Sequence, residues 1–115
     1  MFEVQRTPNG LIVNGSVDSV LKCLEMGDWG WTTNSGVASD GSRAIEVKGH
    51  VLKDNGVAAI VSVRPHMSNQ TQIKVESWKG KSMSALGGNV FNVGVKKFQS
   101  KVTEKAFQIL TSGMY

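Results

Sequence analysis

Apolar residues along the chain recur with two different periods, and the points where the period changes divide the sequence into elements. The first helical period begins after Ser16, a good N-cap, and stops at Gly27. Its apolar positions follow the i, i+3, i+4, i+7 spacing of an amphipathic helix and comprise Val17, Val20, Leu21 and Leu24. The pattern predicts a short helix in the N-terminal half.

A second apolar stripe predicts a longer C-terminal helix. Its members lie three or four residues apart and are Phe91, Val95, Phe98, Val102, Ala106 and Ile109. Glycine is a poor helix former, and glycines cluster just before this stripe. We therefore expect the helix to begin between Asn89 and Asn92 and to close at Gly113.

Between and before the helices, apolar and polar residues alternate, which is typical of strands. Thr7-Pro8-Asn9-Gly10 and Asp54-Asn55-Gly56 are turn sequences. Residues 57–64 are apolar on both faces, which favours a central strand, and the sequence 34–42 is typical of a loop. The first strand either pairs with the second or forms a loose arm. The expected strands are 2–6, 11–14, about 28–33, 44–52, 57–64 and 71–78.

This order of elements predicts an α+β fold. An antiparallel sheet of about four to five strands, with both helices on one face, would form a two-layer sandwich. The chain has 115 residues, and 40% of them are hydrophobic. We therefore expect residues 1–115 to fold as a single domain.

The net charge of +4 lies in the last third of the chain, where six lysines accompany one glutamate after residue 76. Lys97, Lys101 and Lys105 recur every four residues on the C-terminal helix. This stripe would suit an acidic partner or nucleic acid, and it would equally suit a solvated helix face.

No catalytic or metal-binding pattern survives inspection. Gly80-Lys81-Ser82 resembles the end of a phosphate-binding loop, but that pattern needs a glycine where this chain has Val75. Neither His50 nor His66 has a second ligand at metal spacing, and Cys23 has no identifiable histidine partner. We expect no enzyme activity, no cofactor and no metal.

Four aromatic residues are candidates for binding. Trp78 falls on the polar side of its strand, where it could anchor a protein partner. Trp29, Trp31 and Phe91 could line a cavity for a small apolar ligand between the sheet and the C-terminal helix.

These features favour a non-enzymatic binding or assembly module that acts through protein–protein contacts, including self-association. The alternatives are a carrier of a small apolar ligand and a weak nucleic-acid binder that uses the lysine stripe. No secretory signal and no run of ~20 apolar residues is visible, so we expect a cytoplasmic location without a membrane span.

The segments "LIVNGSVDSVLKCLEMGDWGW", "RAIEVKGHVL" and "TQIKVESW", followed by the closing helix, form a strand–helix–strands–helix pattern. In this the chain resembles a class of small bacterial domains found in uncharacterised envelope lipoproteins. The resemblance implies the fold only. Neither the signal peptide nor the lipid-acceptor cysteine of that class is visible in the sequence, so we expect that an envelope location does not carry over.

Overall fold

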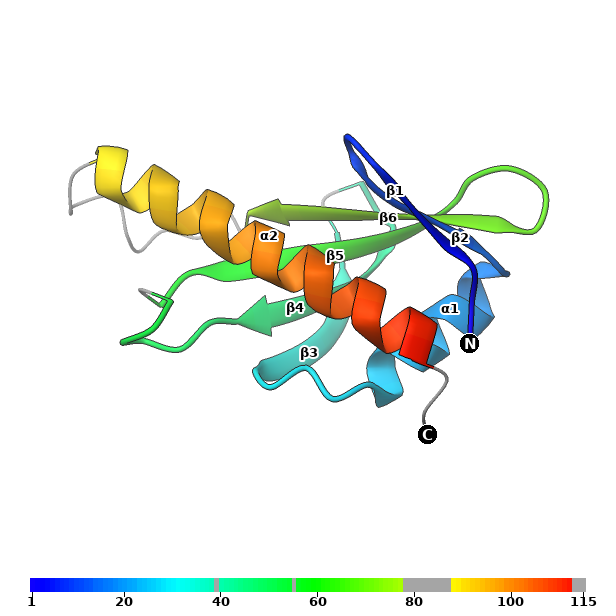
Figure 1. Cartoon of the computed structure of the whole chain (residues 1–115), viewed down its shortest axis with the longest axis horizontal. Coiled ribbons are helices and arrows are strands. Elements are labelled where there is room, and N and C mark those ends of the chain that lie inside the picture. Colours follow the sequence, from blue (N-terminus) through cyan, green and yellow to red (C-terminus); the bar gives the residue numbers. More distant parts are fainter. Residues whose placement is uncertain (39, 55, 78–87, 113–115) are drawn as a thin grey trace.

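The structure is a computed structural model that describes residues 1–38, 40–54, 56–77 and 88–112. These residues form one antiparallel sheet of six strands in the order β1-β2-β6-β5-β4-β3. The long helix α2 crosses one face of this sheet, with α1 beside its C-terminal end (Figure 1). In chain order the elements are β1 (Val4–Thr7), β2 (Gly10–Asn14), α1 (Val17–Met26), β3 (Thr32–Val37), β4 (Arg43–Lys48), β5 (Ala58–Pro65), β6 (Gln70–Ser77) and α2 (Gly88–Ser112).

The α+β class and the antiparallel sheet predicted from the sequence are confirmed, but the sheet has six strands among the described residues. Both N-terminal segments join it as a β1–β2 hairpin in which Val4 lies opposite Val13. A tight turn at Gly10 makes this hairpin possible. The φ of Gly10 is +141°, and a side chain at this position would collide with the carbonyl oxygen of Ile73.

The boundaries of the middle strands differ from the prediction in two places. β3 begins at Thr32 and runs through 34–37, which we expected to be loop, because pairing with β4 supplies ladder bonds to these polar residues. β4 ends at Lys48, so residues 49–52 do not extend the strand as expected. They belong to a loop between β4 and β5, in which Val51 and Leu52 are exposed.

The cap residues of α1 act as the sequence predicted. Ser16 Oγ accepts a hydrogen bond from the backbone N–H of Ser19, and the Gly27 N–H donates to the Leu24 carbonyl. A side chain at Gly27 would place its Cβ 2.6 Å from Ile109 Cγ2. Glycine at the end of α1 therefore lets this helix approach α2 closely.

One apolar core lies between the helices and the inner face of the sheet. From α2, the buried side chains are spaced four residues apart and comprise Phe98, Val102, Ala106 and Leu110. Leu110, rather than the predicted Ile109, is the fully buried residue in the last turn. The backbone N–H of Phe2 donates to the Leu110 carbonyl at 2.9 Å, which ties the first residues to the same turn.

We expect Leu110→Ala to lower the free energy of unfolding by about 2–5 kcal/mol, because it leaves a cavity in a closed core. The substitution keeps the backbone bond to Phe2, so the loss would measure side-chain packing alone. Met26→Ala is the matched control, since Met26 is exposed on α1 and its loss should cost within about 0.5 kcal/mol. Urea unfolding monitored by circular dichroism measures both. An equal loss of unfolding free energy in the two variants would contradict the placement of Leu110 in the core.

Candidate functional site

A single buried carboxylate organises the loop between β4 and β5. Asp54 is 3% exposed in its side chain, and one of its oxygens accepts from the backbone N–H of His50 at 2.9 Å. The same oxygen accepts from Trp31 Nε1 at 3.1 Å, while Lys101 Nζ reaches the other oxygen at 3.0 Å. Asp54 thus joins the loop, the segment before β3 and the helix α2.

Burial alone would raise the pKa of Asp54. The hydrogen bonds from His50, Lys101 and Trp31, together with the charge of Lys101, outweigh that effect and hold the pKa below its ordinary value. The group is therefore a carboxylate at neutral pH, and each of its oxygens is paired.

A groove of about 450 Å³ lies beside this carboxylate, between the 49–57 loop and α2. Its walls include four residues that the sequence had assigned to two separate sites: Trp29, Trp31, Lys101 and Lys105. His50, Lys53 and Gln108 complete much of the lining. The fold therefore brings the aromatic and the basic candidates together in one place.

The two tryptophans contribute differently to this groove. Trp29 is 3% exposed, and its Nε1 donates to the Leu24 carbonyl at 2.8 Å, so it belongs mainly to the core. Trp31 is half-buried and packs edge-on against Phe98, with ring centroids 5.2 Å apart. Trp31 is therefore the aromatic residue that offers surface to a ligand.

The lysine stripe is divided in the structure. Lys97 is exposed on α2 and lies outside the groove lining. Lys101 pairs with Asp54, so it could meet a phosphate only by weakening that pair. Lys105 is half-buried at the groove. The three lysines thus do not present one uniform basic surface.

The remaining aromatic candidates fall outside what can be described. Trp78 lies outside the described residues, and Phe91 lies in α2 with its side chain outside the description. Where α2 is described, core side chains occupy the centre of its interface with the sheet. A hollow of about 480 Å³ lies at one margin of that interface, between the β1–β2 hairpin and α2.

Asp54, His50 and Lys53 were missed as site residues by the sequence analysis. Asp54 was assigned to a hairpin turn, and nothing next to it in the sequence signals a buried carboxylate. Its side-chain partners lie 23 and 47 positions away. Only the tertiary fold brings these groups together.

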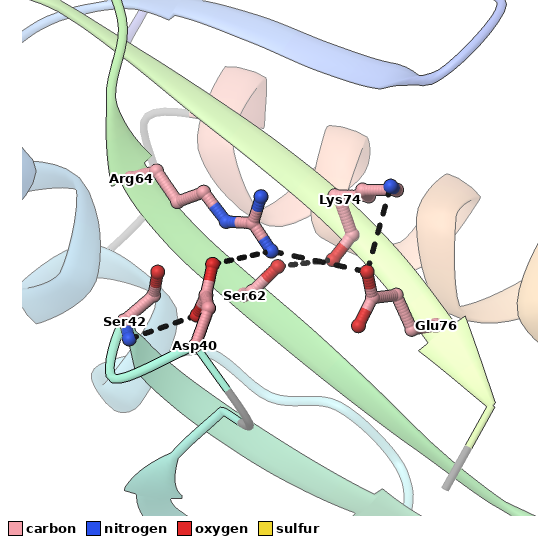
Figure 2. Close-up of polar contacts among 6 residues, drawn as sticks. All are labelled: Asp40, Ser42, Ser62, Arg64, Lys74 and Glu76. Atoms are coloured by element: carbon pink, nitrogen blue, oxygen red, sulfur yellow. Dashed lines mark hydrogen bonds and ion pairs between the residues drawn. The ribbon is translucent and has the colours of Figure 1, made fainter.

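The face of the sheet opposite the helices carries a network of paired charges (Figure 2). On β5, Arg64 Nη2 lies 2.9 Å from Oδ2 of Asp40, in the turn after β3. The same nitrogen lies 3.8 Å from Oε1 of Glu76 on β6. Lys74 also reaches Glu76, at 3.5 Å. Arg64 Nε is buried without a hydrogen-bond partner in the part of the chain that is described. The charges on this face already satisfy one another to a large extent.

Cys23 faces the junction of the two helices. Its Sγ lies 3.8 Å from the Ile109 carbonyl, and burial raises the pKa of the thiol. A raised pKa keeps the group as a thiol, which is the less nucleophilic form.

The residues that the structure describes contain no group of three or more histidine, cysteine, aspartate or glutamate side chains that could hold a metal ion. Among these same residues, no helix has the length and apolar character needed to cross a membrane.

Replacing Asp54 by Asn should lower the free energy of unfolding by about 1–3 kcal/mol at neutral pH, because the Lys101 charge loses its partner. The folded-state pKa of Asp54 lies below the unfolded value of about 3.9. Its stabilisation is therefore present above that value and is lost as pH falls through the folded pKa. Urea unfolding of both proteins along a pH series should show a difference that is constant near neutrality and shrinks in acid. A difference independent of pH would contradict the role of the charge.

Comparison with protein-family models, curated proteins and solved structures found no match to this chain.

Proposed function

We propose that this chain is a non-enzymatic assembly module that associates with a second copy of itself through the free edge of β3. The observation that carries the proposal is the character of this edge. β3 is six residues long, ends the sheet on one side, and contains neither a charged residue nor a proline. Natural sheets usually protect exposed edges with such residues or with a covering element.

The register of β3 identifies the groups that face outward. The N–H of Ala38 donates to the carbonyl of Ser42, continuing the pairing in which Val37 lies opposite Arg43. In an antiparallel pair, hydrogen-bonded positions alternate along each strand. Even-numbered residues of β3 therefore bond to β4. The outward N–H and C=O groups belong to Thr33, Ser35 and Val37.

The opposite edge of the sheet is protected. β1 has four residues, and Pro8 follows it directly. Its Arg6 lies 3.8 Å from the centre of the Phe107 ring and makes two hydrogen bonds to the Glu104 carboxylate, the shorter at 2.7 Å. A second strand could pair with β1 only next to this anchored charge, which favours β3 as the edge for assembly.

A second copy is the partner that suits β3. Each outward residue supplies both a donor and an acceptor, so two β3 strands related by a two-fold axis can satisfy one another in antiparallel pairing. The strand brings no charge of its own to that contact. Two carboxylates from neighbouring elements contact its side chains: Glu25 on α1 accepts a hydrogen bond from Ser35 Oγ at 2.7 Å, and Glu46 on β4 accepts one from Asn34 Nδ2 at 3.4 Å.

The open face of the sheet is less suited to this role. Its charged side chains are paired within the chain, and a partner would have to bury or break those pairs. Edge pairing leaves them in place.

The substitution Ser35→Pro should convert the dimer to a monomer. Proline removes an outward N–H and leaves the bonds to β4 intact, a position where edge strands tolerate it. Ser35→Ala is the matched control, because both variants lose the hydroxyl bond to Glu25 and only the first loses the N–H. Native mass spectrometry and sedimentation equilibrium would measure the mass of each protein against the 12.4 kDa of one chain.

The expected result is a dimer for the unaltered chain and for Ser35→Ala, with a folded monomer for Ser35→Pro. Circular dichroism would confirm that the proline variant keeps its fold. A monomeric unaltered chain, or a dimer that survives Ser35→Pro, would refute pairing through β3.

A further inference from the structure

We infer that the groove between the 49–57 loop and α2 binds a small planar aromatic molecule that carries one acidic group. The inference does not depend on self-association, because the groove residues lie outside β3. It rests on the charge of the groove, on its aromatic surface and on its size.

The groove has an excess of positive charge once its internal pairs are counted. Three lysines line it together with two carboxylates, those of Asp54 and Glu104. Lys101 neutralises Asp54, and Arg6, which lies outside the groove lining, holds Glu104 through two hydrogen bonds. Each carboxylate is thus already occupied.

Two cations of the groove lining have no acidic partner among the described residues: Lys53 from the loop and Lys105 from α2. They belong to different elements, so an anion between them would make contacts from two sides. His50 adds a third group on the loop side that can form a hydrogen bond. The groove therefore favours a negatively charged ligand.

The aromatic surface comes from Trp31. Its indole is held in one orientation by the bond from Nε1 to Asp54 and by the edge-on contact with Phe98. A fixed, half-buried ring offers a stacking surface to a planar ligand with little loss of side-chain entropy. The volume of about 450 Å³ lies within the range of small-molecule sites.

This site differs from the one that the sequence suggested. The expected ligand was apolar and lay between the sheet and the C-terminal helix. The groove instead lies at the side of α2, and its free lysines require an acidic group on the ligand.

The probe is 8-anilinonaphthalene-1-sulfonate, an anion with a planar naphthalene ring system, whose fluorescence rises on binding. N-phenyl-1-naphthylamine has the same rings without the sulfonate and is the matched neutral probe. The variant is Lys53→Gln/Lys105→Gln, which removes both free cations. Lys97→Gln is the control, because Lys97 is exposed on the same helix outside the groove.

The anionic probe should bind the unaltered chain and Lys97→Gln equally, and should bind the double variant roughly tenfold less tightly, as expected for the loss of charge-assisted contacts. The neutral probe should bind all three proteins with the same, lower affinity. Equal binding of the anionic probe to all three proteins, no binding at all, or an equal loss for both probes would overturn the inference.

Nuclear magnetic resonance places the probe independently. The indole N–H signal of Trp31, identified by its absence in Trp31→Phe, should shift on addition of the anionic probe. Binding that leaves this signal unmoved would place the probe elsewhere and overturn the inference. Repeating the titration with Ser35→Pro would give the same affinity, because the groove lies within one copy of the chain.

Discussion

The carboxylate of Asp54 holds together the part of the structure that carries the candidate site. The Asp54 side chain is only 3% exposed, and a carboxylate so deeply buried is tolerated only when its oxygens accept hydrogen bonds or form an ion pair. The hydrogen bonds to the Asp54 carboxylate are donated by the loop backbone, by Trp31 and by Lys101 on α2. Because these three segments are distant in the sequence, one side chain fixes the path of the loop and the orientation of the indole together.

The elements with regular periods could be predicted from the sequence, since burial of one face imposes the period directly. Ser16 and Gly27 bounded α1 because capping is a local effect. β3 was harder, because Asn34, Ser35 and Gly36 have little strand propensity and extend only by pairing with β4. The 49–57 loop could not be predicted, because its conformation depends on a carboxylate whose side-chain partners lie elsewhere in the chain.

The candidate site was predicted in pieces. The sequence marked Trp31, Lys101 and Lys105 for separate reasons, and the fold places them around one groove. The sequence could not show that Lys101 forms an ion pair with Asp54 while Lys105 has no acidic partner among the described residues. That distinction depends on contacts between α2 and a loop more than forty residues earlier. Charge pairing, rather than the number of lysines, decides which side chains are available to a ligand.

The position of both helices on one face of the sheet has a consequence for an assembled pair. Antiparallel pairing of two β3 strands requires a two-fold axis perpendicular to the sheet, and such a rotation keeps each layer on its own side. The described helices of both copies, α1 and α2 from each, would then cover one side of a continuous sheet, and the two open faces would merge on the other. The network around Arg64 and Glu76 would occur twice on that single surface, in two rows that run in opposite directions.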